Sequence, residues 1–252
     1  MKVVARGQPP GRSGVGGLVS VAADPYEFAF HPASSALLLI DMQRDFLEPG
    51  GFGERLGNDV ALLARVVEPL RQVLMSVRQA GMMIVHTREG HRPDLSDCPP
   101  SKLARGRLEL GIGSAGPKGR ILVRGELGHD IVDELAPHPG EAVLDKPGKG
   151  SFYATDLELI LRNAGVMSLV VTGVTTEVCV HTTVREANDR GFECLVLSDC
   201  VGSYFPEFHR VALEMISAQG GIFGWVTDSA ELLAGLGAAV QPAAIAGVAK
   251  GA

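Results

Sequence analysis

Cys179 is the residue of this sequence best placed to act as a nucleophile. It follows an apolar run at residues 167–171 and a short Thr-rich turn, within the stretch VTGVTTEVCVHTTVR, where a segment with helical character begins. The first residues of a helix present unpaired N–H groups and the positive end of the helix dipole to whatever lies in front of them. Such surroundings favour the thiolate, the form of cysteine that attacks. We therefore expect Cys179 to be the attacking group of a cysteine hydrolase.

Two further polar residues stand at the ends of predicted strands. Asp41 closes the apolar run ALLLID, and Lys146 follows a short strand at residues 141–145. Parallel α/β sheets bind ligands at the carboxyl ends of their strands, so neighbouring strands would bring these side chains and Cys179 into one cleft. A thiol, a carboxylate that takes its proton and a cation that holds the charges satisfy the needs of nucleophilic catalysis. Taken singly, an Asp can cap a loop, a Lys can be a solvated charge and a Cys can simply pack.

The elements that must position these residues alternate between strand and helix. Strands are predicted at residues 36–41, 82–85, 141–145, 167–171, 192–197 and 222–226. Helices are predicted at residues 58–80, 155–163 (with a Thr155–Glu158 capping box), 179–190, 207–218 and 229–236, with a helical turn at 131–135. This alternation predicts a three-layer α/β/α sandwich around a mostly parallel six-stranded sheet, Rossmann-like in architecture.

The chain reads as one domain with two extensions. Residues 1–35 are expected to form an N-terminal arm, either disordered or wrapped on a neighbouring subunit, because Gly and Pro are frequent there and no helical period is visible. Residues 36–236 form the domain, and residues 237–252 an Ala- and Gly-rich tail with weak order. Residues 87–126 have little periodicity, which is typical of a functional loop or a lid.

Composition excludes several classes of protein. The 252 residues carry a net charge of −6 without clustered Lys and Arg, so no nucleic-acid surface is expected. No apolar run approaches the roughly 18 residues of a membrane span, and the N-terminus lacks the apolar core of a signal peptide, so we expect a cytoplasmic protein. The other cysteines (Cys98, Cys194 and Cys200) are expected to pack, and no C-x-x-C pair suggests zinc. Gly111–Gly116 fits a bare G-x-G-x-x-G pattern, but it does not follow a strand.

Three of these stretches together resemble the isochorismatase-like cysteine hydrolases: LLLIDMQRDF, the strand-terminal Lys146, and GVTTEVCV. The resemblance covers residues 36–236. It implies a catalytic triad of Asp41, Lys146 and Cys179 and a cis peptide between Val174 and Thr175. It also implies an oxyanion hole formed by the backbone N–H groups of Thr175 and Cys179. No cofactor is implied.

Within that family the sequence is most similar to the biuret amidohydrolases and their relatives that act on triuret. The stretches that carry this likeness are HTREGHRPDLSD, DKPGKGSFYATDL, REANDRGFECL and QGGIFG. The likeness implies that Lys149 and Gln219 hold the carbonyl and amide groups of the substrate and that Phe46 forms part of the pocket wall. Tyr153 and the loop at residues 87–126 would set the pocket depth. A homo-oligomer, dimer or tetramer, is also implied.

The histidines have plainer interpretations. Nicotinamidases of this family hold a metal with an Asp-x-His pair after the second strand, and the corresponding stretch here, from His86 to His91, lacks that pattern. Two His five residues apart in a loop, without a third ligand, make a poor metal site, so we expect no metal. His181 lies two residues after Cys179, which points it away from the thiol on a helix, and His209 is expected to be structural or on the surface.

The sequence therefore predicts an amidohydrolase that cleaves a C–N bond of a small ureide, biuret or triuret, and releases ammonia through a thioester intermediate on Cys179. Isochorismatases keep the fold without the cysteine, so that activity is not expected. Two alternatives stay open. One is hydrolysis of ureidoacrylate or another N-carbamoyl amide, and the other is an inactive family scaffold that serves as a binding module.

Overall fold

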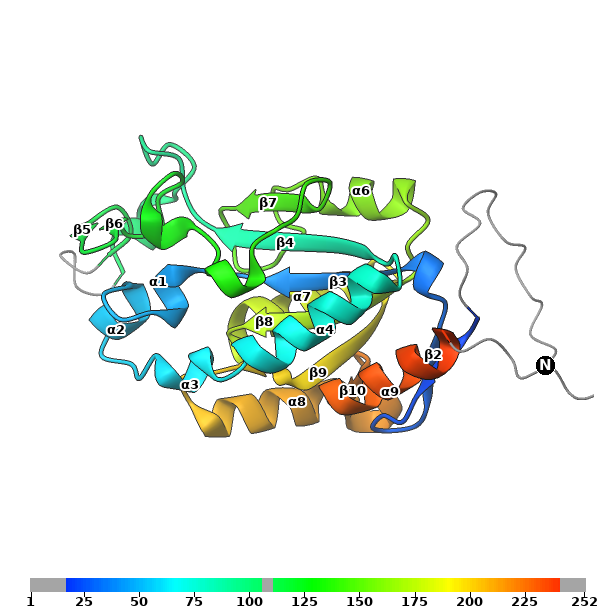
Figure 1. The fold of residues 1–252 in the computed structure, drawn as a ribbon. Helices are drawn as coiled ribbons and strands as arrows, with labels where there is room; N and C mark the ends of the chain where they lie inside the picture. The colour runs from blue at the N-terminus through cyan, green and yellow to red at the C-terminus, as the bar shows by residue number, and fades with distance from the viewer. Residues whose placement is uncertain (1–16, 106–110, 241–252) are drawn as a thin grey trace, which may run out of the picture.

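A single six-stranded sheet forms the centre of the molecule. The computed structural model describes residues 17–105 and 111–240. The strands follow the order β10-β9-β8-β3-β4-β7, and every neighbouring pair is parallel. Their bounds are Ser35–Ile40 (β3), Met83–Glu89 (β4), Ala142–Lys146 (β7), Ser168–Val174 (β8), Glu193–Gly202 (β9) and Trp225–Thr227 (β10). The predicted parallel sheet is confirmed, and its carboxyl edge lies at the left of Figure 1.

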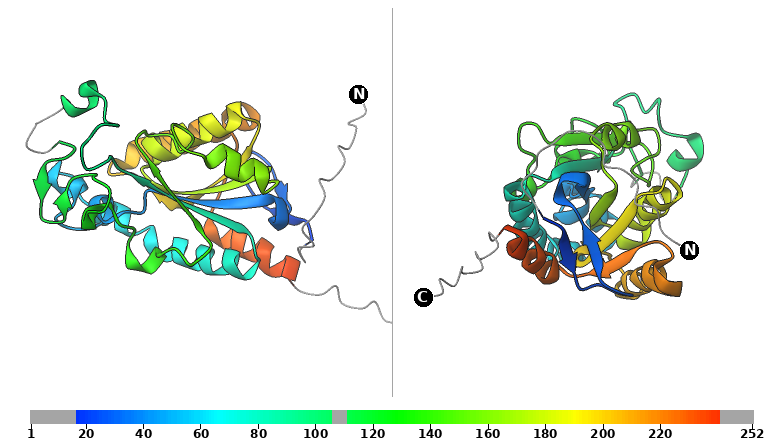
Figure 2. Two further views of the ribbon diagram at one scale, coloured as in Figure 1. Left: turned by 90° about the horizontal axis from the view of Figure 1, so that it is seen from above. Right: turned by 90° about the vertical axis from the view of Figure 1, so that its right-hand side faces the viewer.

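Helices cover both faces of this sheet, as Figure 2 shows. One face carries α4 (Val67–Gln79) and α9 (Ser229–Val240), and the other carries α6 (Leu157–Asn163), α7 (His181–Asp189) and α8 (Pro206–Gly221). Successive residues of β3 point to opposite sides: Leu37 and Leu39 enter one core, while Leu38 and Ile40 enter the other. A strand buried on both faces has a continuous apolar sequence, which is why ALLLID predicts a central strand; the observed strand, SALLLI, begins and ends one residue earlier.

The remaining elements are short and lie mainly beyond the carboxyl edge of the sheet. They are α1 (Arg44–Leu47), α2 (Phe52–Arg55), α3 (Ala61–Ala64), α5 (Pro100–Leu103), β5 (Ala115–Gly116), β6 (Gly119–Arg120), and 3₁₀ turns at Leu127–His129 and Asp133–Leu135. The predicted helix at residues 58–80 is divided into α3 and α4. The predicted turn at 131–135 is only partly helical, because Ile131 pairs with Gln43 as an isolated β-bridge.

The predicted capping box at the start of α6 is wrong. The N-cap of α6 is Asp156, whose side chain makes no capping hydrogen bond, and the Thr155 hydroxyl accepts the N–H of Leu157 at 3.3 Å. Thr155 instead donates its hydroxyl to the carbonyl of Ser151 at 2.6 Å, and Glu158 pairs with Arg190 at 3.0 Å. Thr155 therefore bonds to the backbone of its own loop, and Glu158 pairs with an arginine instead of completing the box.

Residues 17–35 are not an extended arm. β1 (Val19–Val21) and β2 (Phe28–Phe30) form an antiparallel hairpin whose inward side chains are buried in the core beside α4 and α9. The Thr227 hydroxyl donates to the carbonyl of Ala22 at 2.6 Å, which ties this hairpin to the last strand of the sheet. Residues 1–16 lie outside the described residues. The tail was expected to begin at residue 237, but α9 continues to Val240, and residues 241–252 again lie outside the described part.

The cysteines expected to pack do so: Cys98, Cys194 and Cys200 are all buried and free. No helix in residues 17–105 and 111–240 is both long and apolar enough to cross a bilayer.

Candidate active site

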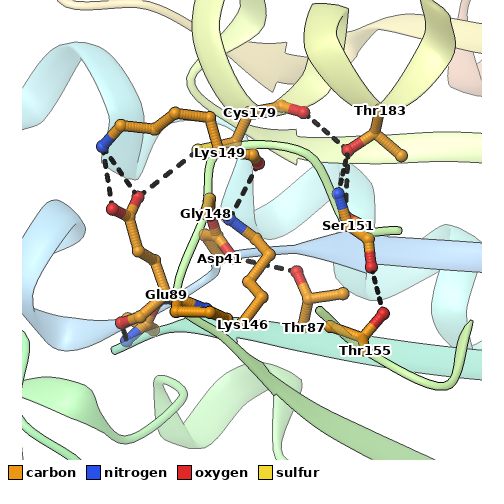
Figure 3. A network of polar contacts seen from close by, with 12 residues as sticks. Asp41, Thr87, Glu89, Lys146, Gly148, Lys149, Ser151, Thr155, Cys179 and Thr183 are labelled. Atoms are coloured by element: carbon orange, nitrogen blue, oxygen red, sulfur yellow. Dashed lines mark hydrogen bonds and ion pairs between the residues drawn. The ribbon is translucent and has the colours of Figure 1, made fainter. Parts of the chain in front are cut away.

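The three strand-end residues singled out in the sequence meet at the carboxyl edge of the sheet (Figure 3). Asp41 follows β3, Lys146 ends β7 and Cys179 follows β8. The Lys146 Nζ lies 2.7 Å from Asp41 Oδ2, and both side chains are fully buried. A fourth strand, β4, contributes Glu89 to the same cluster, because a carboxylate oxygen of Asp41, one of Glu89 and the Cys179 Sγ all lie within 4.8 Å of one another. The parallel sheet thus gathers a thiol, two carboxylates and an ammonium group at one point.

Asp41 is held in place by its neighbours on β4. Its backbone is left-handed (φ 54), a conformation that Asp tolerates better than most residues, and its N–H donates to the carbonyl of Thr87 at 3.1 Å. The Thr87 hydroxyl donates to Asp41 Oδ1 at 2.8 Å. The carboxylate therefore has one oxygen fixed by a hydroxyl and the other by the ammonium of Lys146.

Lys146 is a buried cation with three oxygen partners. Besides Asp41, its ammonium donates to the carbonyls of Gly148 at 3.0 Å and Lys149 at 2.9 Å. Burial alone would lower the pKa of Lys146, but the charges of Asp41, Cys179 and Glu89 raise it above its usual value. Lys146 consequently stays protonated and shapes the loop that follows β7.

Cys179 lies in a single π-helical turn, Thr176–Val180, between β8 and α7. The peptide between Val174 and Thr175 is cis. The thiol is 4% exposed and donates to Glu89 Oε2 at 3.6 Å. Burial raises the pKa of Cys179 well above its usual value, although Lys146 acts in the opposite direction. The expectation of a thiol already pushed toward thiolate is therefore wrong: the proton has to be removed when the sulfur attacks.

Glu89 is the site residue that the sequence did not predict. It is 1% exposed, and its carboxylate accepts from Lys149 at 2.8 and 3.1 Å and from Lys102 at 2.9 Å. Burial acts to raise the pKa of Glu89, but the charges of Lys149, Lys146 and Lys102 outweigh it and hold the pKa at about 2. Glu89 ends β4, which lies between the strands that carry Asp41 and Lys146, so a longer predicted strand would have placed this carboxylate at the site. The strand predicted from the sequence ends at residue 85.

The backbone of Glu89 is fixed by Gln43, from the LLLIDMQRDF stretch. The buried Gln43 amide donates to the carbonyls of Glu89 and His129, each at 3.0 Å, and its carbonyl accepts the N–H of Glu89 at 2.7 Å. All of these bonds are buried, so the turn after β4 has little freedom. On the other side of the site, Ser151 donates its N–H to the Thr183 hydroxyl at 3.0 Å, which in turn donates to the carbonyl of Cys179 at 2.7 Å.

The structure brings some of the predicted substrate contacts to this edge. Lys149 reaches Glu89, and together with Lys102 and Tyr153 it lines a hollow of about 440 Å³. Tyr153 is 59% exposed and packs against Gly148. Phe46 lies on α1, after the Asp41 turn, with its ring centroid 6.4 Å from that of Phe52.

Gln219 is not brought to the site. α8 returns from the carboxyl edge of the sheet to the opposite edge, where Gly221 approaches Pro25 and β10 begins. Gln219 is exposed there, in a left-handed backbone conformation (φ 55) near the end of α8. Within one chain Gln219 therefore does not reach Cys179, since a helix that follows a strand runs back along it, and its expected contact with the substrate stays a prediction.

The histidines fall into separate networks. His86 pairs with Glu141 at 3.0 Å and His91 with Asp97 at 3.2 Å, so they do not face each other. His181 packs its ring against Phe223, with centroids 6.1 Å apart. His209 is not an isolated surface residue: its Nδ1 lies 2.9 Å from the Thr176 hydroxyl, and it supports the turn that carries Cys179.

Asp41, Glu89 and Cys179 have the side-chain types of a metal site. Lysine ammonium groups, and not a metal ion, balance the two carboxylates: one lies 2.7 Å from Asp41 and another 2.8 Å from Glu89. A divalent cation would have to enter beside these ammonium groups, which like-charge repulsion opposes. The donor set therefore fits an ion-paired thiol site better than a metal centre.

Comparison with known proteins agrees with this site. The sequence matches the family described as the isochorismatase domain over residues 35–231. The chain belongs to the isochorismatase family. Members of this family are hydrolases. The solved structures that resemble this chain include a cysteine hydrolase. The fold, the thiol and the paired charges thus agree with the family assignment.

Solved structures of the isochorismatase fold superpose on most of the chain. A cysteine hydrolase from Pseudomonas syringae pv. phaseolicola 1448A is 27% identical, with a TM-score of 0.71, and the match covers 83% of this chain and 95% of that one. N-carbamoylsarcosine amidase from Thermoplasma acidophilum is 25% identical, with a TM-score of 0.60, covering 78% and 96%. A pyrazinamidase/nicotinamidase from Streptococcus mutans UA159 shares the fold at 24% identity, with a TM-score of 0.62, covering 77% and 100%.

Proposed function

We propose that this isochorismatase-family hydrolase is a cysteine amidohydrolase that cleaves a C–N bond of a small ureide, with biuret or triuret as its substrate. The observation that carries the proposal is the buried Lys146–Asp41 ion pair, 2.7 Å long, beside the Cys179 thiol. A buried ion pair is costly to desolvate. Its position next to a thiol suits proton transfer better than it suits structural support.

In the first half of the reaction, Asp41 takes the proton of Cys179 as the sulfur attacks the terminal carbonyl carbon. The backbone N–H groups of Thr175 and Cys179 form the oxyanion hole, where one donor typically contributes about 2.7–4 kcal/mol. Asp41 then gives its proton to the departing nitrogen. The C–N bond breaks, ammonia leaves and the acyl group remains on sulfur as a thioester.

In the second half, Asp41 takes a proton from water, and the resulting hydroxide attacks the thioester carbon. The C–S bond breaks, the sulfur recovers a proton from Asp41, and the product leaves as the N-carbamoyl carbamate in the case of biuret. Lys146 stays an ammonium throughout and balances the charge that alternates between Asp41 and Cys179. The net change is one amide and one water converted to one acid and one ammonia.

The alternatives differ in the group beyond the scissile bond. N-carbamoylsarcosine amidase is named for a carbamoyl amide, so an N-carbamoyl amide or ureidoacrylate is the second candidate class. An inactive scaffold would have no use for a thiol, two carboxylates and an ammonium gathered at one sheet edge. The homo-oligomer, dimer or tetramer, stays a prediction that sedimentation of the full chain will test.

Ammonia release from a substrate panel tests the proposal. The panel consists of biuret, triuret, ureidoacrylate, N-carbamoylsarcosine and nicotinamide, with Cys179→Ser as the inactive control. We expect turnover of biuret or triuret to exceed that of nicotinamide by at least about 100-fold. Silence on all four ureido compounds would overturn the proposal, and a preference for ureidoacrylate or N-carbamoylsarcosine would select the second candidate class.

A further inference from the structure

We propose that Glu89 makes this site selective for ureides over ordinary carboxamides. Its carboxylate accepts the N–H that flanks the scissile carbonyl, and the adjacent Lys149 ammonium donates to the next carbonyl along the substrate. The inference rests on the proposed amidohydrolase function and names the group that selects the substrate class.

The first support is the distance between Glu89 and the attacking atom. Glu89 Oε2 lies 3.6 Å from the Cys179 Sγ. A carbonyl carbon ready for attack lies about 3–3.5 Å from the sulfur. A substituent of that carbon on the Glu89 side comes within hydrogen-bonding distance of the carboxylate. An N–H in that position finds an acceptor, whereas a CH₂ finds a buried charge that it cannot pair with.

The second support is that Glu89 is suited to accept rather than to transfer protons. Three lysine ammonium groups hold its pKa at about 2, against the effect of burial, so it stays ionised at neutral pH. A carboxylate that acidic is a weak base. Asp41 keeps the proton-transfer role, and Glu89 supplies a fixed negative charge facing the substrate.

The third support is the pairing of opposite charges on Glu89 and Lys149. The Lys149 Nζ lies 2.8 and 3.1 Å from the two Glu89 oxygens, and the side chain is 46% exposed and lines the hollow of about 440 Å³. An ammonium has three donors, so it can serve a substrate carbonyl as well as Glu89. An acceptor beside a donor is complementary to the N–H and C=O groups that alternate along a ureide. This pair fills the role that the sequence had assigned to Lys149 and Gln219.

The fourth support is the rigidity of the Glu89 carboxylate. Gln43 fixes its backbone, and Lys102 fixes its Oε1 from α5 while also donating to the carbonyl of Pro147 at 2.8 Å. A pre-positioned acceptor discriminates best, because a substrate without the matching N–H places an apolar group against the charge and gains no hydrogen bond there. A hydrogen bond to a charged group of this kind corresponds to about a 10- to 100-fold difference in kcat/KM.

Biuret and malonamide form a matched pair for the test, because malonamide replaces the central N–H of biuret with CH₂. The quantity to measure is the ratio of kcat/KM for biuret to that for malonamide, in wild type and in Glu89→Gln. Biuret and malonamide differ in intrinsic reactivity, but this difference is the same for both enzymes. It therefore cancels when the ratio in Glu89→Gln is divided by the ratio in wild type. We expect the ratio to fall about 10- to 100-fold in Glu89→Gln, mainly through KM for biuret. The control is Glu158→Gln, which removes a carboxylate of α6 that pairs with Arg190. It should leave the ratio unchanged.

Three results separate this inference from the proposed function. A ratio that changes by less than about threefold in Glu89→Gln, with both substrates still turned over by wild type, overturns the role of Glu89 and leaves the amidohydrolase intact. A wild type that releases ammonia from no ureide overturns both. If Glu89→Gln does not fold, Glu89→Asp is measured instead. Its shorter side chain keeps the negative charge but moves it away from the substrate, and an unchanged ratio again overturns the inference.

Discussion

Replacing Lys146 with methionine tests how the centre of the site is held together. Lys146 and Asp41 are both fully buried, with Nζ and Oδ2 2.7 Å apart. The same ammonium donates to the carbonyls of Gly148 and Lys149. Methionine fills a similar volume without charge. Lys146→Met therefore leaves a buried carboxylate without its counter-ion and two carbonyls without a donor.

Removing one partner of a buried ion pair costs about 3–5 kcal/mol. We expect Lys146→Met to lose at least about 3 kcal/mol of unfolding free energy, a large fraction of the typical 5–15 kcal/mol. In the double variant Asp41→Asn/Lys146→Met no charge is stranded, although an unsatisfied amide still costs about 1–3 kcal/mol. The double variant should therefore be more stable than Lys146→Met by about 2 kcal/mol, while both lack activity.

Urea denaturation at pH 7 followed by circular dichroism gives the free energies, and ammonia release gives the activity. A double-mutant cycle over the four proteins isolates the coupling between the two side chains. The reasoning is refuted if the unfolding free energy of Lys146→Met lies within about 1 kcal/mol of that of wild type. It is also refuted if adding Asp41→Asn to Lys146→Met lowers the unfolding free energy as much as it does in wild type.

Three further predictions concern the rest of the site. A folded-state pKa for Glu89 of about 2, below its usual 4.5, means that its stabilising contribution is present above pH 4.5 and is lost as the pH falls toward 2. The stability gap between wild type and Glu89→Gln should accordingly narrow by about 2 kcal/mol from pH 6 to pH 3, and a constant gap in urea titrations would contradict this. Gly173→Ala should cost at least about 2 kcal/mol, since φ is +109 and its Cβ would lie 2.1 Å from the Ile40 carbonyl, whereas Gly165→Ala (φ +70), with no atom within 4 Å, should cost about 1 kcal/mol in the same assay. Dialysis against a chelator should leave ammonia release unchanged, and a loss restored by Zn²⁺ would reopen the question of a metal.

The sheet and the meeting of Asp41, Lys146 and Cys179 could be predicted because local patterns determine them. Continuous apolar runs predict buried parallel strands, and polar residues that end such strands collect at one edge. The conclusion also required these strands to be close together in the sheet, and the order β8-β3-β4-β7 meets that condition. The same reasoning extends β4 only to residue 85, because His86 and Thr87 are polar and indicate a loop.

What the sequence could not supply were partners distant along the chain. His86 and Thr87 are tolerated inside β4 because Glu141 and Asp41 satisfy them, and this continuation of the strand carries Glu89 to the site. The role of Gln219 was assigned by likeness alone, without following the direction of α8. The hairpin at residues 19–30 was missed because its strands have three residues each and are buried by α9, some 200 residues away in the sequence.

The central claim, a thioester on Cys179, is tested most directly by trapping that intermediate. Purified enzyme is mixed with biuret, quenched in acid within milliseconds and digested, and the peptides are weighed by mass spectrometry. We predict a mass increase equal to one biuret minus ammonia on the peptide that contains Cys179, removable by hydroxylamine and missing in Cys179→Ser. Steady ammonia release with Cys179 unmodified at every time point, or turnover by Cys179→Ser above a tenth of the wild-type rate, would contradict it.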